Sequence, residues 1–402
     1  MAQQINPPRG MRDFLPVEKA TRDELLGKIL ASYRSFGFQE IETPALENIE
    51  RLTSSDGGDN ESLAFRVLKR GEELEGALGQ SADQLSDLGL RYDLTVPLTR
   101  FYATNQSKLP KVLKAIQTGP VWRAERPQKG RYRQFVQCDI DIIGDDSSLA
   151  EIEILNASLH ALAALGITTA TIRVNHRELL SRSIQELGVE AKDHSRAMIT
   201  IDKLDKIGID GVCLELKERF DDEVAAKAKT WLSGLAGKQA VPQQLEAVFA
   251  ALELVHPGKL RFDPTLVRGM GYYTGIIFEI EHPESGSSIG GGGRYDGMVG
   301  KWLGEDVAAV GISLGFERVA DLVAAELSAN KNLVLVFEPS DLQQALAAQA
   351  QAIAAGYQVR LEPKPKKLNT VLDSLKLQGF SSFASLDKPA EGFKGLVIKP
   401  IG

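Results

Sequence analysis

The sequence predicts a chain of several domains that mixes α and β structure, and three observations support this prediction. With 402 residues, the chain is longer than one ordinary domain. Strand-like and helical patterns alternate over most of it, but residues 177–256 are helix-rich and charged. From residue 333 onwards a β-α-β-α-β rhythm begins. We therefore expect a first mixed part over 1–176, a helical insertion over 177–256, a second mixed part over 257–330 and a small α/β domain over 331–402.

The composition is that of an average soluble globular protein, with 43% apolar and 25% charged residues. The net charge of −7 excludes a cationic surface over the whole molecule, although it allows a local basic patch. Two cysteines, Cys138 and Cys213, cannot form a disulfide framework, so we expect a reducing cytoplasm. Because the N-terminus lacks an apolar leader and no long apolar run follows, we expect neither a signal peptide nor a transmembrane helix.

The N-terminal elements follow from periodicity and from turn residues. Residues 17–36 place apolar side chains at helical spacing, and Gly37 is suited to end that helix. The alternating stretch FQEIETPALE predicts a strand that reaches Pro44. A proline there removes a ladder donor, which favours a sheet edge or an interface. Residues 66–94 predict short strands around a polar loop.

The later elements alternate in the same way. The segment ATIRVNHRELL predicts a strand that leads into a helix, and VGISLGFERV predicts the same order. Further helices are expected over 95–104 and 149–165, and further strands over 112–124, 133–143 and 272–282.

The strongest chemical signal is a basic stretch over residues 110–135. It holds seven Lys or Arg residues and one Glu in a chain that is acidic as a whole. Strand alternation places Arg123 and Glu125 on one face, beside the turn-like ERPQKGRY. Arginine binds phosphate oxygens in bidentate geometry and keeps its charge. The stretch is therefore either a solvated basic hairpin or an anion site.

Three more segments join glycine to charged or aromatic residues. In RGMGYYTG, glycines after Arg268 allow close backbone approach. Tyr272 and Tyr273 would face opposite sides of a strand, one toward a pocket and the other toward the core, and core packing is the alternative for either tyrosine. The run SSIGGGGRYDG is either a flexible loop or a stretch buried beneath a flat ligand. In VGISLGFERV, Arg318 lies inside an apolar run, where a cation is costly unless it meets an anion.

Asp93 and Thr95 alternate onto one face of LRYDLTVPLTR. They could hold an ammonium group, or cap the helix that follows. The sequence contains no P-loop, no dinucleotide fingerprint, no metal-ligand spacing and no nucleophile elbow. A nucleotide would therefore have to be bound in another way.

The stretches ERPQKGRYRQF, RGMGYYTG and GGGRYDG resemble the histidyl-tRNA synthetase family, which is part of the class II aminoacyl-tRNA synthetases. The resemblance implies an α+β fold with an antiparallel sheet flanked by helices, a helical insertion and a small C-terminal α/β domain. Residues 1–176 and 257–330 would form two parts of the catalytic domain. Residues 331–402 would form a shortened anticodon-binding-like domain.

The resemblance also implies three class II sequence motifs. Motif 1 would surround FGFQEIETPALE, with Pro44 at a homodimer interface. Motif 2 would be residues 121–144, and motif 3 residues 310–319.

The implied activity is that of a histidine–tRNA ligase. The carboxylate of L-histidine would attack the α-phosphate of ATP, giving histidyl-adenylate and pyrophosphate, and histidine would then pass to the 3′ end of tRNA(His). Because the nucleophile is already an anion, alignment and charge neutralisation carry the reaction, and arginines should dominate the site. The resemblance further implies Mg²⁺ bound with ATP, no metal of the protein's own, a homodimer in the cytoplasm and no membrane partner.

By resemblance, each ligand has its own set of residues. Catalysis would depend on Arg268 and Arg123 at the α-phosphate. The ATP site would comprise Arg123, Glu125, Arg131 and Arg318. The histidine site would comprise Asp93, Thr95, Gln137, Asp141, Tyr272, Tyr273, Gly291 and Gly292. The acceptor end of tRNA would meet Gln128, Lys129 and Arg131.

Two departures from the family pattern leave rival functions open. Gly271 stands where the family usually has aspartate, and the tail is short. One rival is a catalytically silent paralogue that serves as the histidine-binding regulatory subunit of ATP phosphoribosyltransferase. The other activates histidine for an acceptor other than tRNA. Because Arg123, Arg268 and Arg318 are all present, the ligase is favoured over the regulatory subunit.

Overall fold

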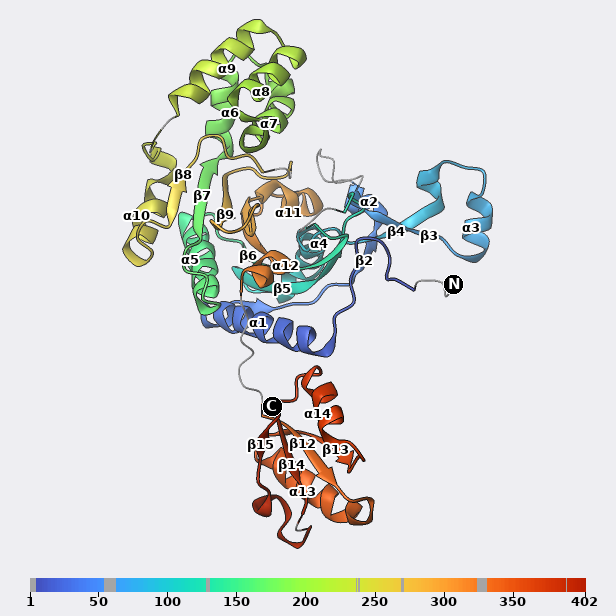
Figure 1. Cartoon of the computed structure of the whole chain (residues 1–402). Coiled ribbons are helices and arrows are strands. Elements are labelled where there is room, and N and C mark those ends of the chain that lie inside the picture. Colours follow the sequence, from blue (N-terminus) through green and yellow to red (C-terminus); the bar gives the residue numbers. More distant parts are fainter. Residues whose placement is uncertain are drawn as a thin grey trace. The chain divides into compact units, whose positions relative to one another are not determined.

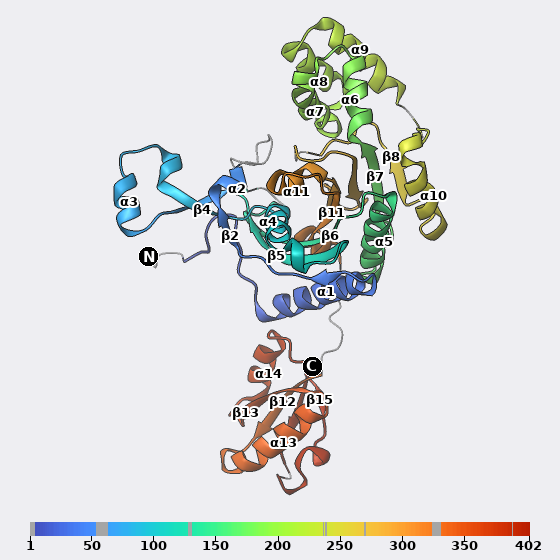
Figure 2. The ribbon, with the colours of Figure 1, turned by 180° about the vertical axis from the view of Figure 1, so that it is seen from behind.

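The computed structural model describes residues 5–53, 63–127, 131–235, 237, 239–268, 271–323, 331–387 and 389–402 (Figures 1 and 2). Its contacts divide the chain into two compact units. The larger unit includes Leu26–Val323, and the smaller one includes the C-terminal part of the chain together with Asp13–Leu25.

An eight-stranded mixed sheet forms the larger unit, with the strand order β1-β5-β6-β11-β10-β9-β7-β8 (Figure 1). The strands from β5 to β7 in this order pair antiparallel, as the resemblance implies, while β1 and β8 join the two edges in parallel. The strands are β1 (Gln39–Glu40), β5 (Leu113–Trp122), β6 (Gln134–Ile143), β7 (Thr171–His176), β8 (Leu260–Phe262), β9 (Ile276–Glu281), β10 (Gly290–Arg294) and β11 (Ala309–Gly315).

Helices flank this sheet, and α5, α11 and α12 contact strands β6 or β11. The first helix ends as predicted, because Gly37 has a φ of 81° and the Phe38 amide donates to the Tyr33 carbonyl. Outside the insertion and the C-terminal part, the described helices are α1 (Pro16–Ser35), α2 (Ile49–Thr53), α3 (Gly71–Ala77), α4 (Thr95–Asn105), α5 (Ser148–Ala164), α11 (Asp296–Leu303) and α12 (Phe316–Leu322).

Two N-terminal predictions differ from the structure. The strand expected to reach Pro44 ends at Glu40, and Pro44 lies in the connection from β1 to β2 (Leu46–Asn48). The expected polar loop contains α3, in which Ala77 is the buried residue, so its apolar pattern is too weak to predict a helix. The strands before and after it in the sequence, β3 (Phe65–Leu68) and β4 (Ser86–Leu90), form a small sheet with β2 in the order β2-β4-β3.

The stretch predicted as an insertion is helical, as expected. Its first four α-helices share an apolar core that includes Leu180, Met198, Val212 and Leu232. Contact clustering keeps this stretch in the larger unit, so its limits as a separate domain stay a prediction. The helices are α6 (Arg177–Glu186), α7 (His194–Ile201), α8 (Leu204–Arg219), α9 (Asp222–Gly234) and α10 (Glu246–Val255).

A four-stranded sheet of order β13-β12-β14-β15 lies in the smaller unit. Its central strand β12 (Asn332–Phe337) is apolar after Asn332 because Leu333 and Leu335 pack against the helix α13, whereas Val334 and Val336 pack against α14. The other elements are β13 (Gln358–Pro363), β14 (Ser382–Ser385), β15 (Lys399–Pro400), α13 (Leu342–Ala354) and α14 (Leu368–Lys376), which match the predicted rhythm.

Among the helices in the described ranges, none is both long enough and apolar enough to cross a lipid bilayer.

Candidate active site

A cavity of about 640 Å³ lies over one face of the large sheet. Its floor is a row of residues that pair directly across neighbouring strands, and such partners project from the same face. The row runs from β5 to β9 through Gln117, Asp139, Ser313, Gly291 and Glu279, of which the last four line the cavity.

One wall of the cavity offers hydrogen-bond acceptors. Gln137, Asp139 and Asp141 alternate along β6, so all three face the cavity. The amide of Gln137 donates to the Ser313 hydroxyl at 2.7 Å, and the Tyr295 hydroxyl donates to Asp141 at 2.7 Å. Oε1 of Gln137 and Oδ1 of Asp139 are buried and have no partner within the described residues. Such acceptors favour a ligand that brings N–H donors.

The two carboxyl oxygens of Asp93 have different surroundings. Its Oδ1 accepts the Val96 amide at 3.1 Å, in the first turn of α4, whereas its buried Oδ2 has no partner in the described part of the chain. The capping and ligand-holding interpretations are therefore compatible, one for each oxygen. Burial raises the pKa of Asp93 to about 6, and burial likewise raises the pKa of Asp141 to about 7.

Four arginines also line the cavity. Arg123, Arg131, Arg268 and Arg318 all line it, although they come from distant parts of the chain. Burial lowers the pKa of Arg318, and the charges of Arg131 and Arg123 lower it further. Mutual repulsion of this kind is relieved by a bound anion.

Several contacts orient these guanidinium groups. Nε of Arg123 donates to the Tyr92 carbonyl at 3.0 Å, and its guanidinium lies 5.0 Å from the centroid of the Phe135 ring. Nη1 of Arg318 donates to the Ser288 carbonyl. Nη1 of Arg131 lies 3.7 Å from Oε2 of Glu125, which also lines the cavity.

Arg268 lies flat on the glycine strand β10. A Cβ atom on Gly291 would come within 2.7 Å of the Arg268 guanidinium carbon. Nη1 of Arg268 donates to Oε2 of Glu279 at 2.7 Å, while its buried Nε has no partner within the described ranges. The glycine run is thus not a loop; it is a central strand without side chains that leaves room for an arginine, and Gly290 and Gly291 line the cavity.

The two adjacent tyrosines both line the cavity, because β9 begins only at Ile276 and strand alternation does not reach them. Their ring centroids lie 4.8 Å apart. The prediction that Tyr272 and Tyr273 face opposite sides of a strand is therefore wrong.

The structure gathers most of the predicted site residues around this one cavity. Those that line it are Asp93, Thr95, Arg123, Glu125, Arg131, Gln137, Asp141, Arg268, Tyr272, Tyr273, Gly291 and Arg318. Gly292 does not line it, since a Cβ there would meet the Gly311 carbonyl on the opposite side of β10. Gln128 and Lys129 lie outside the described residues.

Sequence reasoning missed several lining residues, of which Asp139, Glu279, Asp202 and Glu317 have carboxyl side chains. Asp139 follows from strand alternation between Gln137 and Asp141, so that signal was available. Glu279 is placed by its pairing with Gly291, and Asp202 comes from the insertion after α7, so neither has a local signal.

Comparison with known proteins gives the family. The family model described as histidyl-tRNA synthetase matches residues 10–319. A protein of Leifsonia xyli subsp. xyli named histidine–tRNA ligase is 50% identical over 431 residues, covering 100% of this chain and 99% of that protein. One of Tropheryma whipplei named probable histidine–tRNA ligase is 43% identical, with 99% of each covered. The chain belongs to the histidyl-tRNA synthetase family.

Solved structures agree with a histidyl-tRNA synthetase fold. The histidyl-tRNA synthetase of Nostoc sp. PCC 7120 superposes with a TM-score of 0.79 and 26% identity, covering 99% of this chain and 97% of that one. A Bacillus halodurans C protein described as an ATP phosphoribosyltransferase regulatory subunit/histidyl-tRNA synthetase gives a TM-score of 0.75 at 20% identity, covering 93% and 97%, which shows a shared fold alone. The predicted family and fold class are confirmed, and the two relatives compared by sequence are named as a histidine–tRNA ligase and a probable histidine–tRNA ligase.

In this synthetase, an N-terminal segment supports the base of the basic hairpin. The Gly10 carbonyl accepts the Arg133 amide at 2.8 Å. Nη2 of Arg12 donates to Oε2 of Glu317 at 2.7 Å, and its guanidinium lies 3.8 Å from the Tyr132 ring centroid. Tyr132 and Glu317 line the cavity, so Arg12 connects two of its walls.

We expect Arg12→Ala to raise the KM for ATP about three- to tenfold. The change removes the contacts of Arg12 with Tyr132 and Glu317, which directly adjoin Arg131 and Arg318 in the sequence. Steady-state pyrophosphate exchange at varied ATP measures this. Arg9→Ala, an exposed arginine in the same segment, is the matched control. An equal rise in both variants would contradict a specific role for Arg12.

The buried carboxyls of this synthetase predict a pH-dependent stability. Unfolded, Asp93 and Asp141 have a pKa near 3.8; folded, their pKa values are about 6 and about 7. Between these limits the unfolded state ionises while the folded state keeps its protons, so the free energy of unfolding falls as pH rises from about 4 to 7.

In Asp141→Asn, the total fall in the free energy of unfolding over this pH range should be smaller by about 1–4 kcal/mol, because asparagine does not titrate. Chemical denaturation between pH 4.5 and 8 measures the slope, with the exposed Asp83→Asn as control. A slope in Asp141→Asn identical to that of the parent would show that Asp141 titrates normally.

Proposed function

We propose that this synthetase activates L-histidine with ATP and transfers it to the 3′ end of tRNA(His). The observation that carries the proposal is that buried acceptors and four arginines line one and the same cavity. We place the acceptors at one end of it, the acceptor end, and the arginines at the other, the arginine end. An amino acid brings a cation and N–H donors to the first end, and a triphosphate brings anionic oxygens to the second. The reacting carboxylate and α-phosphate then meet between them.

We assign histidine to the acceptor end. Asp93, with one free oxygen, and Thr95 would hold the α-ammonium group. Gln137, Asp141 and Tyr273 would face the imidazole nitrogens. A buried acceptor left unpaired is costly, so a side chain without N–H donors would be rejected. Gly291 and Tyr272 complete the wall of this subsite.

ATP would lie at the arginine end, with Arg123 and Arg268 on the α-phosphate and Arg318 on the γ-phosphate. The carboxylate oxygen of histidine attacks phosphorus, the bond to the bridging oxygen breaks, and pyrophosphate leaves with that electron pair. Fixed cations then stabilise the charge on the equatorial oxygens without reorganisation.

Mg²⁺ would arrive on the phosphates of ATP and help to neutralise them. In the described part of the chain, no three His, Cys, Asp or Glu side chains gather as a metal site. Glu125 lines the cavity beside Arg131 and could supply an oxygen ligand to such an ion.

The tRNA would enter beside the basic hairpin, where Arg131, with Gln128 and Lys129, would meet the acceptor end. Phosphate contacts there would make binding sensitive to salt. We further propose a cytoplasmic homodimer in which Pro44 lies at the interface, and an anticodon-stem contact by residues 331–402.

Histidine-dependent exchange of labelled pyrophosphate into ATP tests the proposal. Exchange with histidine, but not with glutamine or tyrosine, is the expected result, followed by charging of tRNA(His). Folded protein that binds histidine without exchange would instead be a regulatory subunit. Exchange without charging of any tRNA(His) would indicate another acceptor.

A further inference from the structure

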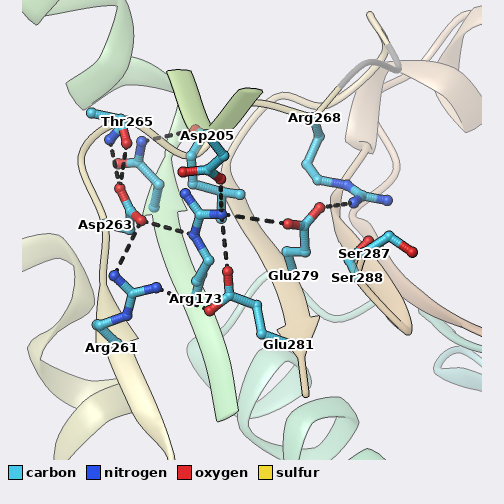
Figure 3. Close-up of polar contacts among 12 residues, drawn as sticks. Arg173, Asp205, Arg261, Asp263, Thr265, Arg268, Glu279, Glu281, Ser287 and Ser288 are labelled. Carbon is cyan, nitrogen blue, oxygen red and sulfur yellow. Dashed lines mark hydrogen bonds and ion pairs between the residues drawn. The ribbon is translucent and has the colours of Figure 1, made fainter. Parts of the chain in front are cut away.

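The polar row on the sheet continues beyond the cavity to Arg173 on β7. Arg173 pairs directly with Glu279 of β9 on one side and with Arg261 of β8 on the other. Figure 3 shows Arg173 among acidic side chains that come from several elements. None of the roles proposed above uses this cluster.

Arg173 is buried, with 7% of its surface exposed, and its guanidinium serves several carboxylates. Its Nε donates to Asp263 at 2.8 Å. Its Nη1 donates to Asp205 at 2.9 Å and to Glu281 at 3.0 Å. A buried guanidinium with this many partners has one geometry available to it, because its planar fork fixes every donor direction.

Nη1 of Arg173 also connects this arginine, through Glu279, to Arg268, the candidate catalytic arginine. Oε1 of Glu279 lies 3.7 Å from Nη1 of Arg173, and Oε2 of Glu279 accepts from Arg268 at 2.7 Å (Figure 3). Glu279 is thus held between two arginines. Moving Arg173 would release one oxygen of Glu279 and with it the orientation of Arg268.

The helical insertion enters this chain of contacts through Asp205. Asp205 lies in the first turn of α8, before the break at Gly208, where φ is 68°. The side chain of Asp205 is 71% exposed, and its ion pair with Arg173 connects the start of α8 to strand β7 of the sheet. Asp202, in the same connection from α7, lines the cavity itself.

We propose that Arg173 is a positioning residue which orients Arg268 through Glu279, and that Asp205 makes this orientation depend on the placement of the helical insertion. The inference rests on the proposed adenylation reaction. It adds a contact by which the insertion acts on the step at the α-phosphate.

Asp205→Asn is the informative change, because it removes a charge from an exposed side chain and keeps its shape. The rate constant kcat for pyrophosphate exchange should fall about three- to tenfold, while the KM for histidine stays unchanged, because the acceptor end is not touched. Asp210→Asn is the matched control: it lies on the same helix, is 88% exposed and pairs with Lys229 instead. It should leave kcat unchanged.

A double-mutant comparison separates this role from a general loosening of the insertion. If Asp205 acts through Arg268, Asp205→Asn should have no further effect in Arg268→Ala, measured as single-turnover adenylate formation. Arg173→Lys should lower kcat at least as much as Asp205→Asn, because lysine cannot serve all the carboxylates. If Arg173→Lys does not fold, the Asp205 series decides alone.

Three results would overturn the inference. The first is an unchanged kcat in Asp205→Asn, and the second is an equal fall in Asp210→Asn. The third is an effect of Asp205→Asn that persists in Arg268→Ala. A parent protein without any exchange would contradict the proposed function itself, so the two failures are distinguishable.

Discussion

Arg268→Ala should lower the rate of histidine-dependent pyrophosphate exchange about 10²–10³-fold, the loss expected for one preorganised donor at a charged transition state. The guanidinium lies on a side-chain-free strand, and its buried Nε has no partner in the described part of the chain. Charging of tRNA(His) should collapse with it. Exchange and charging assays on the purified variant, with oligomeric state measured alongside, check both.

The fold should survive this change, because Glu279 keeps Arg173 within 3.7 Å when Arg268 is lost. Arg34→Ala, which removes an exposed ion pair to Glu40, is the control for arginine loss as such. Unchanged exchange in Arg268→Ala would remove this residue from the mechanism.

Gly311→Ala should raise the KM for histidine about 10–100-fold. A Cβ atom at this position would overlap the carboxylate of Asp141 and crowd the ring of Tyr295. Asp141 is buried and short, so it can make room only by leaving the Tyr295 hydroxyl, and an unsatisfied buried partner costs about 1–3 kcal/mol.

Histidine titration of exchange rates measures this effect. Gly286→Ala is the control, since nothing lies within 4 Å of a Cβ there. If Gly311→Ala kept the parent KM, Asp141 would not contact histidine. A variant that loses histidine affinity but keeps its KM for ATP supports the division of the cavity.

The sequence predicts most elements where a strong period exists. Strands β5 and β6 are long and contain many buried residues, and β12 has apolar side chains on both faces. The sequence therefore predicts all three at nearly the observed limits. Helix α3 was missed because it is charged and nearly all exposed. The spacing of apolar residues in a sequence indicates which side chains are buried, so a helix or strand that buries few side chains shows no clear spacing.

The site could be predicted only in part. Residues in short motifs, such as Arg123 and Arg268, were found and lie around one cavity. Glu279 and Asp202 depend on strand pairing and on the path of the insertion, which single-sequence spacing does not encode. The tyrosine pair was misplaced because strand alternation was applied to residues that lie three and four positions before the strand begins.

The floor of the cavity also has a consequence for synthesis on the ribosome. Gln137 and Ser313 bond across neighbouring strands although 176 residues separate them. Strand β11, which carries Ser313, therefore leaves the exit tunnel long after β6, with the whole helical stretch emerging in between. Until then the carboxyls of β6 have no neighbouring strand on that side, so the nascent protein gains its complete ligand pocket only when the chain has passed Arg318.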